Sequence, residues 1–153
     1  MRRHDKEITE KDFLEKILEE ELVCRIALND NGKPYLVPMI FGYKDNYLLL
    51  HSAKEGKKIE ILRKNNEVCF EVESCVELVP SEIACHWDLK YYCVIGFGRA
   101  YFVDDIEEKE NSLKIIMDKY SGKKTFSFPK ESINKTEIIK IEINQMTGKK
   151  SKV

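Results

Sequence analysis

Apolar residues near the start of the chain recur at the spacing of an α-helix. Between Thr9 and Glu21 they gather on one face, formed by Phe13, Leu14, Ile17 and Leu18. Thr9 belongs to a residue type that caps helices, and Ile8 and Phe13 have the spacing of a hydrophobic staple around it. We therefore predict a helix over residues 9–21 whose apolar face packs on a core.

The period then changes to two, which is the spacing of strands. Alternating apolar positions predict strands over residues 22–28, 35–43, 47–52, 68–72, 91–103 and 137–143. Turn residues at 29–32 and at Asp45-Asn46 join the first three strands into an antiparallel meander. Pro38 lies inside the second strand and cannot donate to a ladder, so its side of that strand is an edge, a bulge or a ligand site.

Two further helices are expected between the strands. The first spans residues 53–65. The second begins near Asp104 or Asp105 and ends at Gly122, because acids fill its first turn and lysines follow, an order that suits the helix dipole.

The rest of the chain is less regular. Residues 73–90 show no clear period, and residues 123–135 predict a loop. The order of the elements predicts a mostly β fold, a six-stranded antiparallel barrel with peripheral helices, in a single domain over residues 1–153.

Charge and composition narrow the function classes. The chain has 26 Lys and Arg against 27 Asp and Glu, and 42% of its residues are hydrophobic. This balance argues against disorder and against a dedicated nucleic-acid binder. No apolar run approaches the roughly 18 residues of a membrane span, and the first residues lack the apolar core of a secretory signal. The five cysteines form no CxxC pair and no even set, so we expect reduced thiols in a cytoplasmic protein.

Residues 51–58, His51-Ser52-Ala53-Lys54-Glu55-Gly56-Lys57-Lys58, join a strand end to a helix start. Helix N-termini carry unpaired amides and partial positive charge, and they favour acids. Here three lysines accompany one acid, an arrangement that costs stability unless an anion binds. The segment indicates a phosphate site, and the alternative is a solvated lysine-rich face.

Two other features carry weaker signals. Gly96 and Gly98 share one strand face, which indicates close approach of another group, and the alternative is ordinary packing at a barrel bend or a neighbouring helix. Cys85-His86 is similar to a fragment of a metal or nucleophile site but has no matching partners, so no metal site is predicted.

Taken together, these residues resemble the pyridoxamine 5′-phosphate oxidase-like flavoproteins with an FMN-binding split barrel, and most of all their nitroimidazole-resistance (Nim-type) branch. The resemblance rests on an ordered set of motifs from residue 1 to about residue 122: Met1-Arg2-Arg3 with Asp5, Ile8-Thr9, residues 23–28, residues 32–43, His51-Ser52-Ala53 with Gly56-Lys57-Lys58, residues 68–72, Cys85-His86-Trp87 and residues 94–100.

The resemblance implies a homodimer with FMN at the subunit interface. It implies that one subunit binds the cofactor through Val37, Pro38, Met39, Ile40, His51, Ser52, Ala53, Lys57 and Lys58, and the other through Trp87, Tyr91 and Tyr92. The Gly96/Gly98 face would lie near that interface. Tyr92 stands where Nim-type relatives often have arginine, and Tyr91 and Tyr92 are expected to stack on the flavin instead.

The function implied is an FMN-dependent reductase of a small electron acceptor such as a nitroaromatic. The alternatives are a non-catalytic flavin or haem binder and a structural dimer whose site has lapsed. Pyridoxamine phosphate oxidase activity is not expected, because residues 147–153 lack the arginine-containing motif of the true oxidases. His51 is the candidate catalytic residue, since histidine titrates near neutral pH and nitro reduction consumes protons. The alternative is that His51 only hydrogen-bonds the cofactor.

Overall fold

The computed structural model describes residues 3–122 and 124–153, so Met1, Arg2 and Lys123, which belong to the N-terminal motif and the expected loop, lie outside the described residues. In chain order the elements are η1 (His4–Lys6), β1 (Glu7–Ile8), α1 (Lys11–Glu20), β2 (Cys24–Asp30), β3 (Lys33–Met39), β4 (Gly42–Lys44), β5 (Tyr47–Ala53), α2 (Lys57–Lys64), β6 (Glu67–Val79), η2 (Ala84–His86), β7 (Asp88–Val103), α3 (Ile106–Ser121), α4 (Lys130–Lys135) and β8 (Thr136–Ser151).

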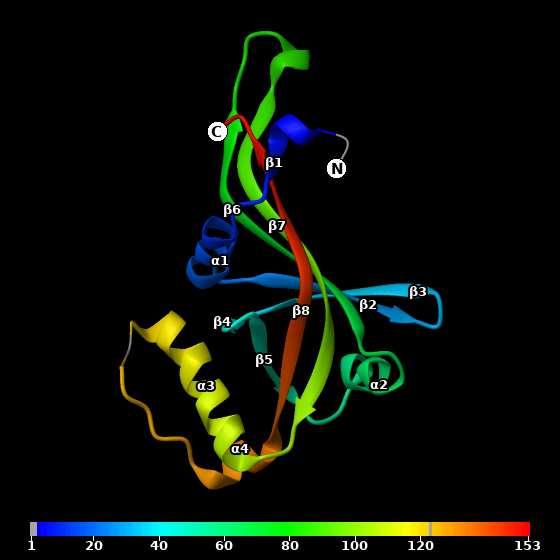
Figure 1. Ribbon diagram of the computed structural model, residues 1–153, viewed down its shortest axis with the longest axis vertical. Helices are drawn as coiled ribbons and strands as arrows, with labels where there is room; N and C mark the ends of the chain where they lie inside the picture. The colour runs from blue at the N-terminus through cyan, green and yellow to red at the C-terminus, as the bar shows by residue number, and fades with distance from the viewer. Residues whose placement is uncertain (1–2, 123) are drawn as a thin grey trace.

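The strands form one antiparallel sheet in the order β3-β2-β6-β7-β8-β5-β4, with β1 paired to β8. The sheet coils, so that β2 and β3 cross the direction of β7 and β8 (Figure 1). The mostly β fold with peripheral helices is confirmed. The described residues form eight strands instead of six, because β1 adds a short pairing and the expected strand 35–43 breaks into β3 and β4.

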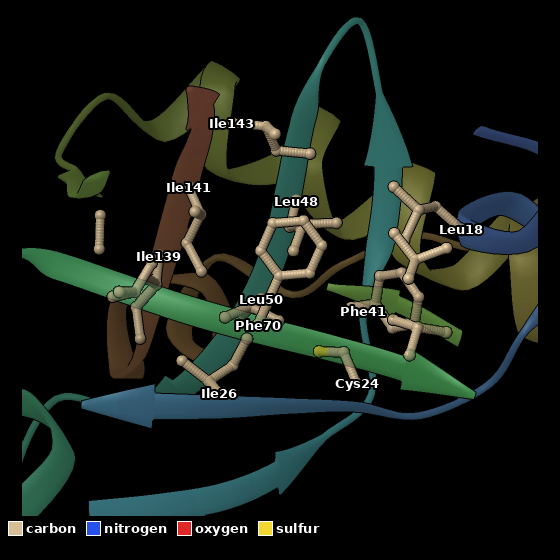
Figure 2. Close-up of a cluster of buried hydrophobic side chains, with 14 of the residues drawn as sticks. Leu18, Cys24, Ile26, Phe41, Leu48, Leu50, Phe70, Ile139, Ile141 and Ile143 are labelled. Atoms are coloured by element: carbon tan, nitrogen blue, oxygen red, sulfur yellow. The ribbon is translucent and has the colours of Figure 1, made fainter. Parts of the chain in front are cut away.

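The core lies inside the coiled sheet. Side chains of β2 and β6 point toward those of β5 and β8, with Phe70 at the centre beside Leu50 (Figure 2). α1 closes one end of this core with Leu14, Ile17 and Leu18, as the apolar face of the predicted helix requires.

The helices confirm some of the local predictions and correct others. Asp105 caps α3 by accepting a hydrogen bond from Glu108 N at 2.8 Å, and Gly122 ends the helix with φ of 68°. Thr9 is not the cap of α1, which begins at Lys11 after Glu10 and has no side-chain cap. Part of the loop expected over 123–135 forms α4 (Lys130–Lys135).

The aperiodic stretch 73–90 is a long hairpin between β6 and β7. A bulge between Ser74 and Glu77, with Cys75 at φ of 53°, shifts the register and breaks the alternation that sequence patterns depend on. The hairpin extends beyond the rest of the sheet (Figure 1). Its exposed apolar side chains are Val76, Leu78, Ile83, Trp87 and Leu89.

Gly96 and Gly98 face the core of their own chain, which corrects the expectation that their face lies at a subunit interface. A Cβ on Gly96 would come within 2.3 Å of the Phe70 ring, and one on Gly98 within 2.2 Å of Glu142 O. Both residues are buried, whereas Ile95 and Phe97 on the opposite face of β7 are 42% and 49% exposed. The side of β7 available to a partner is therefore the opposite one.

Gly98→Ala is expected to lower the free energy of unfolding by about 3 kcal/mol. The new methyl group would clash with the backbone oxygen of Glu142, which cannot move aside by a side-chain rotation. Urea unfolding monitored by circular dichroism measures this loss. Arg99→Ala, at an exposed position of the same strand, is the control and should change the free energy by less than about 1 kcal/mol. Equal effects of the two substitutions would contradict the packing argument.

Candidate functional site

The end of β5 and the start of α2 form a compact turn with unpartnered backbone donors. β5 continues through Ala53, which pairs with Thr136 of β8, so α2 begins at Lys57 and not at residue 53 as expected. Gly56 precedes the helix at φ of 120°, a backbone conformation that favours glycine. It supplies no side-chain cap. The first amides of α2 therefore have no side-chain acceptor, the arrangement that binds anions at helix N-termini.

Two lysines in the first turn of α2 reach across to β2 and β3. Lys57 Nζ is 3.5 Å from Asp30 Oδ2 and 4.9 Å from the centre of the Tyr35 ring. Lys58 Nζ donates to Met39 Sδ at 3.4 Å. Half-burial of Lys58 lowers the pKa of its ammonium group, which means that the charge lacks full solvation. An anion bound beside Lys58 would compensate for this loss.

His51 lies next to this cluster. It pairs with Ile138 across the β5–β8 ladder and is half-buried. Burial lowers its pKa, and the nearby charge of Lys58 lowers it further. The imidazole is therefore mainly neutral at pH 7 in this structure.

β3 is the end strand of the sheet order and presents two different faces. Val37 and Met39 pack against the core, while Pro38 is exposed and Ile40, just beyond the strand, is 41% exposed. Pro38 pairs with Arg25 of β2, and no other strand of the described residues borders β3. The prediction that Pro38 lies at a sheet edge is confirmed. On an edge strand, a proline need not cost the sheet a backbone hydrogen bond.

Trp87, Tyr91 and Tyr92 lie apart from the lysine cluster of their own chain. The β6–β7 turn and α2 are separated along the long axis of the molecule (Figure 1). Trp87 is 49% exposed, and its Nε1 donates to Ser81 O. The Tyr92 ring packs edge-on against Phe13 at 5.0 Å between centroids. Within one chain the structure thus joins the predicted residues of β3, β5 and α2 but not the predicted aromatic residues.

Some residues at the site carry no clear signal in the sequence. Asp30 belongs to a recognised turn, but its pairing with Lys57 depends on how α2 packs against β2. Lys109 and Glu137 form a buried ion pair beside the end of β5. Sequence periodicity places Lys109 on α3 and Glu137 on the last strand, but it does not reveal that they meet.

The structure also bears on other site types. All five cysteines are unpaired. Residues 3–122 and 124–153 contain no group of three or more His, Cys, Asp or Glu side chains able to hold a metal ion. None of the helices that the structure describes is long and apolar enough to cross a membrane.

Solved structures show the same architecture. A candidate 5-nitroimidazole antibiotic resistance protein from Bacteroides thetaiotaomicron is 36% identical, and the match covers 94% of this chain and 85% of that one with a TM-score of 0.84. The flavocytochrome Anf3 of Azotobacter vinelandii is 20% identical over 100% of this chain and 72% of its own, with a TM-score of 0.84. An FAD- and haem-binding protein of Mycobacterium smegmatis is 17% identical over 97% and 74%, with a TM-score of 0.86. The last two likenesses concern the fold alone.

Sequence comparison agrees with this likeness. No protein of curated function matches the chain. The sequence model of pyridoxamine 5′-phosphate oxidase matches residues 10–150, which is almost the whole chain. The match spans α1 through Lys150 of β8, and with them Lys57 and Lys58 of α2 and the edge strand β3. The chain therefore belongs to the pyridoxamine 5′-phosphate oxidase family.

Proposed function

We propose that this protein is an FMN-binding homodimer that reduces small electron acceptors such as nitroaromatics. The uncapped N-terminus of α2, with Lys57 and Lys58 in its first turn, carries this proposal. A terminal phosphate dianion would satisfy the free amides and the two ammonium groups together. The 36% identity to a candidate 5-nitroimidazole resistance protein supports the choice of acceptor.

The residues present suit FMN in position and in chemistry. Ser52, Ala53, Lys57 and Lys58 would hold the phosphate, with His51 beside them. The edge strand over residues 37–40 would lie along the flavin ring, where the free side of β3 offers backbone groups that no other described strand uses. The bound flavin supplies the electron transfer. The chain's own residues would bind and orient it, and His51 would donate a proton to the acceptor from the fraction of imidazole that is protonated.

A second copy of the chain is needed to complete this site, because Tyr91 and Tyr92, which follow Trp87, pair with Ser151 and Lys150 at one end of β8. His51 and Ser52 pair with Ile138 and Glu137 at the other end. The charges of the two regions are complementary. The hairpin over residues 73–90 has four acids against one Lys and no Arg, whereas residues 54–64 have five Lys or Arg against two Glu. Several exposed apolar side chains on the hairpin would be covered in such a dimer.

The visible absorption spectrum of the purified protein tests the proposal. Flavin bands near roughly 375 and 450 nm are expected, and phosphodiesterase treatment should leave the released flavin unchanged if it is FMN and not FAD. Turnover of a 5-nitroimidazole with NADH or NADPH should follow. A Soret band in place of flavin bands, or no colour after incubation with FMN, would refute the cofactor. Bound FMN without turnover would favour a redox-buffering role.

Trp87 provides a test of the dimeric site, because it is the only tryptophan of the chain. Its emission is expected to fall strongly on FMN binding, since the flavin of the partner subunit would lie within contact distance. Fluorescence titration with correction for inner-filter absorption measures the change, and light scattering should show a dimer at micromolar concentration. Unchanged emission at saturation, or a monomer that still binds FMN, would contradict the arrangement.

A further inference from the structure

A buried ion pair lies directly beside the end of β5, where Ser52 and Ala53 are proposed to hold the phosphate. Lys109 Nζ of α3 is 3.4 Å from Glu137 Oε1 of β8 and donates to Thr136 O at 3.2 Å. The two side chains are 8% and 10% exposed, and every other ion pair between described residues is more exposed. A buried pair of this kind is often no more stable than an apolar pair of the same size, so stability alone does not account for it.

Lys109 contacts the first residues of β8, Thr136 and Glu137. Among the described residues, these are the only strand partners of the end of β5. Ser52 pairs with Glu137, and Ala53 pairs with Thr136. The β4 ladder reaches β5 only as far as Leu49, and the β7 ladder reaches β8 only as far as Ile138. The end of β5 is therefore part of a two-stranded ribbon, an arrangement that has little stability by itself. Lys109 attaches this ribbon to α3.

The pair also affects the charge beside Ser52. Ser52 and Glu137 are directly opposite each other in an antiparallel ladder, so their side chains lie on the same face of the sheet. An unpaired Glu137 carboxylate there would repel a phosphate dianion bound at Ser52. The Lys109 ammonium group, 3.4 Å away, neutralises that carboxylate.

We propose that Lys109 is a positioning residue for the cofactor phosphate: it fixes the Ser52 end of β5 through β8 and cancels the charge of Glu137. This inference rests on the proposed function, since it takes a phosphate-bearing flavin as the ligand. It predicts that Lys109 affects FMN, which carries the phosphate, and not riboflavin, which lacks it.

The experiment compares dissociation constants for FMN and riboflavin by flavin fluorescence quenching in flavin-free protein. Lys109→Met should weaken FMN about tenfold while riboflavin changes by less than about twofold, because the Glu137 carboxylate, no longer neutralised, repels only the phosphate. Lys109→Met with Glu137→Gln should restore the preference for FMN to within about threefold of the wild type. Lys140→Met is the matched control, since Lys140 also joins β8 to α3, through Glu108 at 2.9 Å, at a more exposed position. It should leave both constants unchanged.

The outcomes separate this inference from the proposed function. A wild-type protein that binds riboflavin as tightly as FMN would refute the phosphate site itself. A wild-type preference for FMN that Lys109→Met retains, or equal losses for both ligands, would overturn the role of Lys109 alone. If Lys109→Met does not fold, Glu137→Gln decides. It removes the negative charge and leaves Lys109, so FMN should bind about threefold tighter relative to riboflavin, and an unchanged ratio would overturn the inference.

Discussion

Replacing Lys57 and Lys58 together with alanine is expected to weaken FMN binding on the order of 10²-fold or more, with little change for riboflavin. Each charged hydrogen bond to a phosphate contributes about 1.5–3 kcal/mol, so the loss of two is large. Lys58 should account for more than half of it. Its ammonium group is half-buried with a lowered pKa, whereas Lys57 is shared with Asp30. Titration of flavin-free protein with each ligand measures both constants.

The control removes the same number of charges from the other end of the helix. Arg63→Ala with Lys64→Ala takes two positive charges from the last turn of α2, where carbonyl groups and not amides are unpaired. This variant should change FMN and riboflavin binding equally and slightly. If it weakened FMN as much as the first variant did, the effect would be one of overall charge, and the phosphate assignment would be wrong.

His51→Ala is expected to slow reoxidation of the reduced flavoprotein by a nitroaromatic about 10²-fold, because a positioned general acid contributes roughly this much. The variant must first be shown to retain FMN. Stopped-flow mixing of pre-reduced protein with a single equivalent of acceptor measures the chemical step. His51→Gln is the informative companion, since glutamine can hydrogen-bond the cofactor but cannot titrate. A normal rate in His51→Gln would leave His51 with a binding role only.

The pH dependence has a definite sign. Burial and Lys58 lower the pKa of His51, so its protonated fraction grows only as the pH falls below the ordinary histidine value of about 6.5. The rate should therefore rise as the pH falls through this region, and His51→Gln should lose that rise. The same lowered pKa makes protonation favour the unfolded chain, so the stability contributed by neutral His51 is present above about pH 6.5 and is lost as the pH falls below it. Flavin content must be checked at each pH.

Much of the fold could be predicted because its signals are local. Asp105 and Gly122 bound α3 as their residue types indicate, and alternation located most strands. The failures have physical causes. The sequence predicts too early a start for α2 because Ala53, Lys54 and Glu55 are good helix formers. β5 instead continues through Ala53 by pairing with Thr136, which lies more than 80 residues away along the chain. The bulge at Cys75 interrupts the alternation of apolar and polar residues, so the sequence pattern does not reveal the hairpin.

Some residues of the candidate site could likewise be predicted from the local sequence, and others could not. The Lys57–Lys58 turn could be found because an uncapped, lysine-rich helix start is visible in one short segment. The ion pair of Lys109 and Glu137 could not, because neither residue is unusual where it stands in the sequence. Their proposed role depends on the ladder that places Glu137 opposite Ser52, and that pairing exists only in the folded sheet.

The place of β8 in the sheet affects how the chain can fold during its synthesis. Among the strands that the structure describes, β8 alone joins the β5–β4 ladder to the others, so that ladder stays separate until residues 136–151 have left the ribosome. Until then the apolar face of β5 lacks Ile139 and Ile141, and two incomplete sheets expose their inner surfaces. Nascent chains halted before residue 136 should therefore bind chaperones and resist folding, whereas chains whose β8 has emerged should fold in one step.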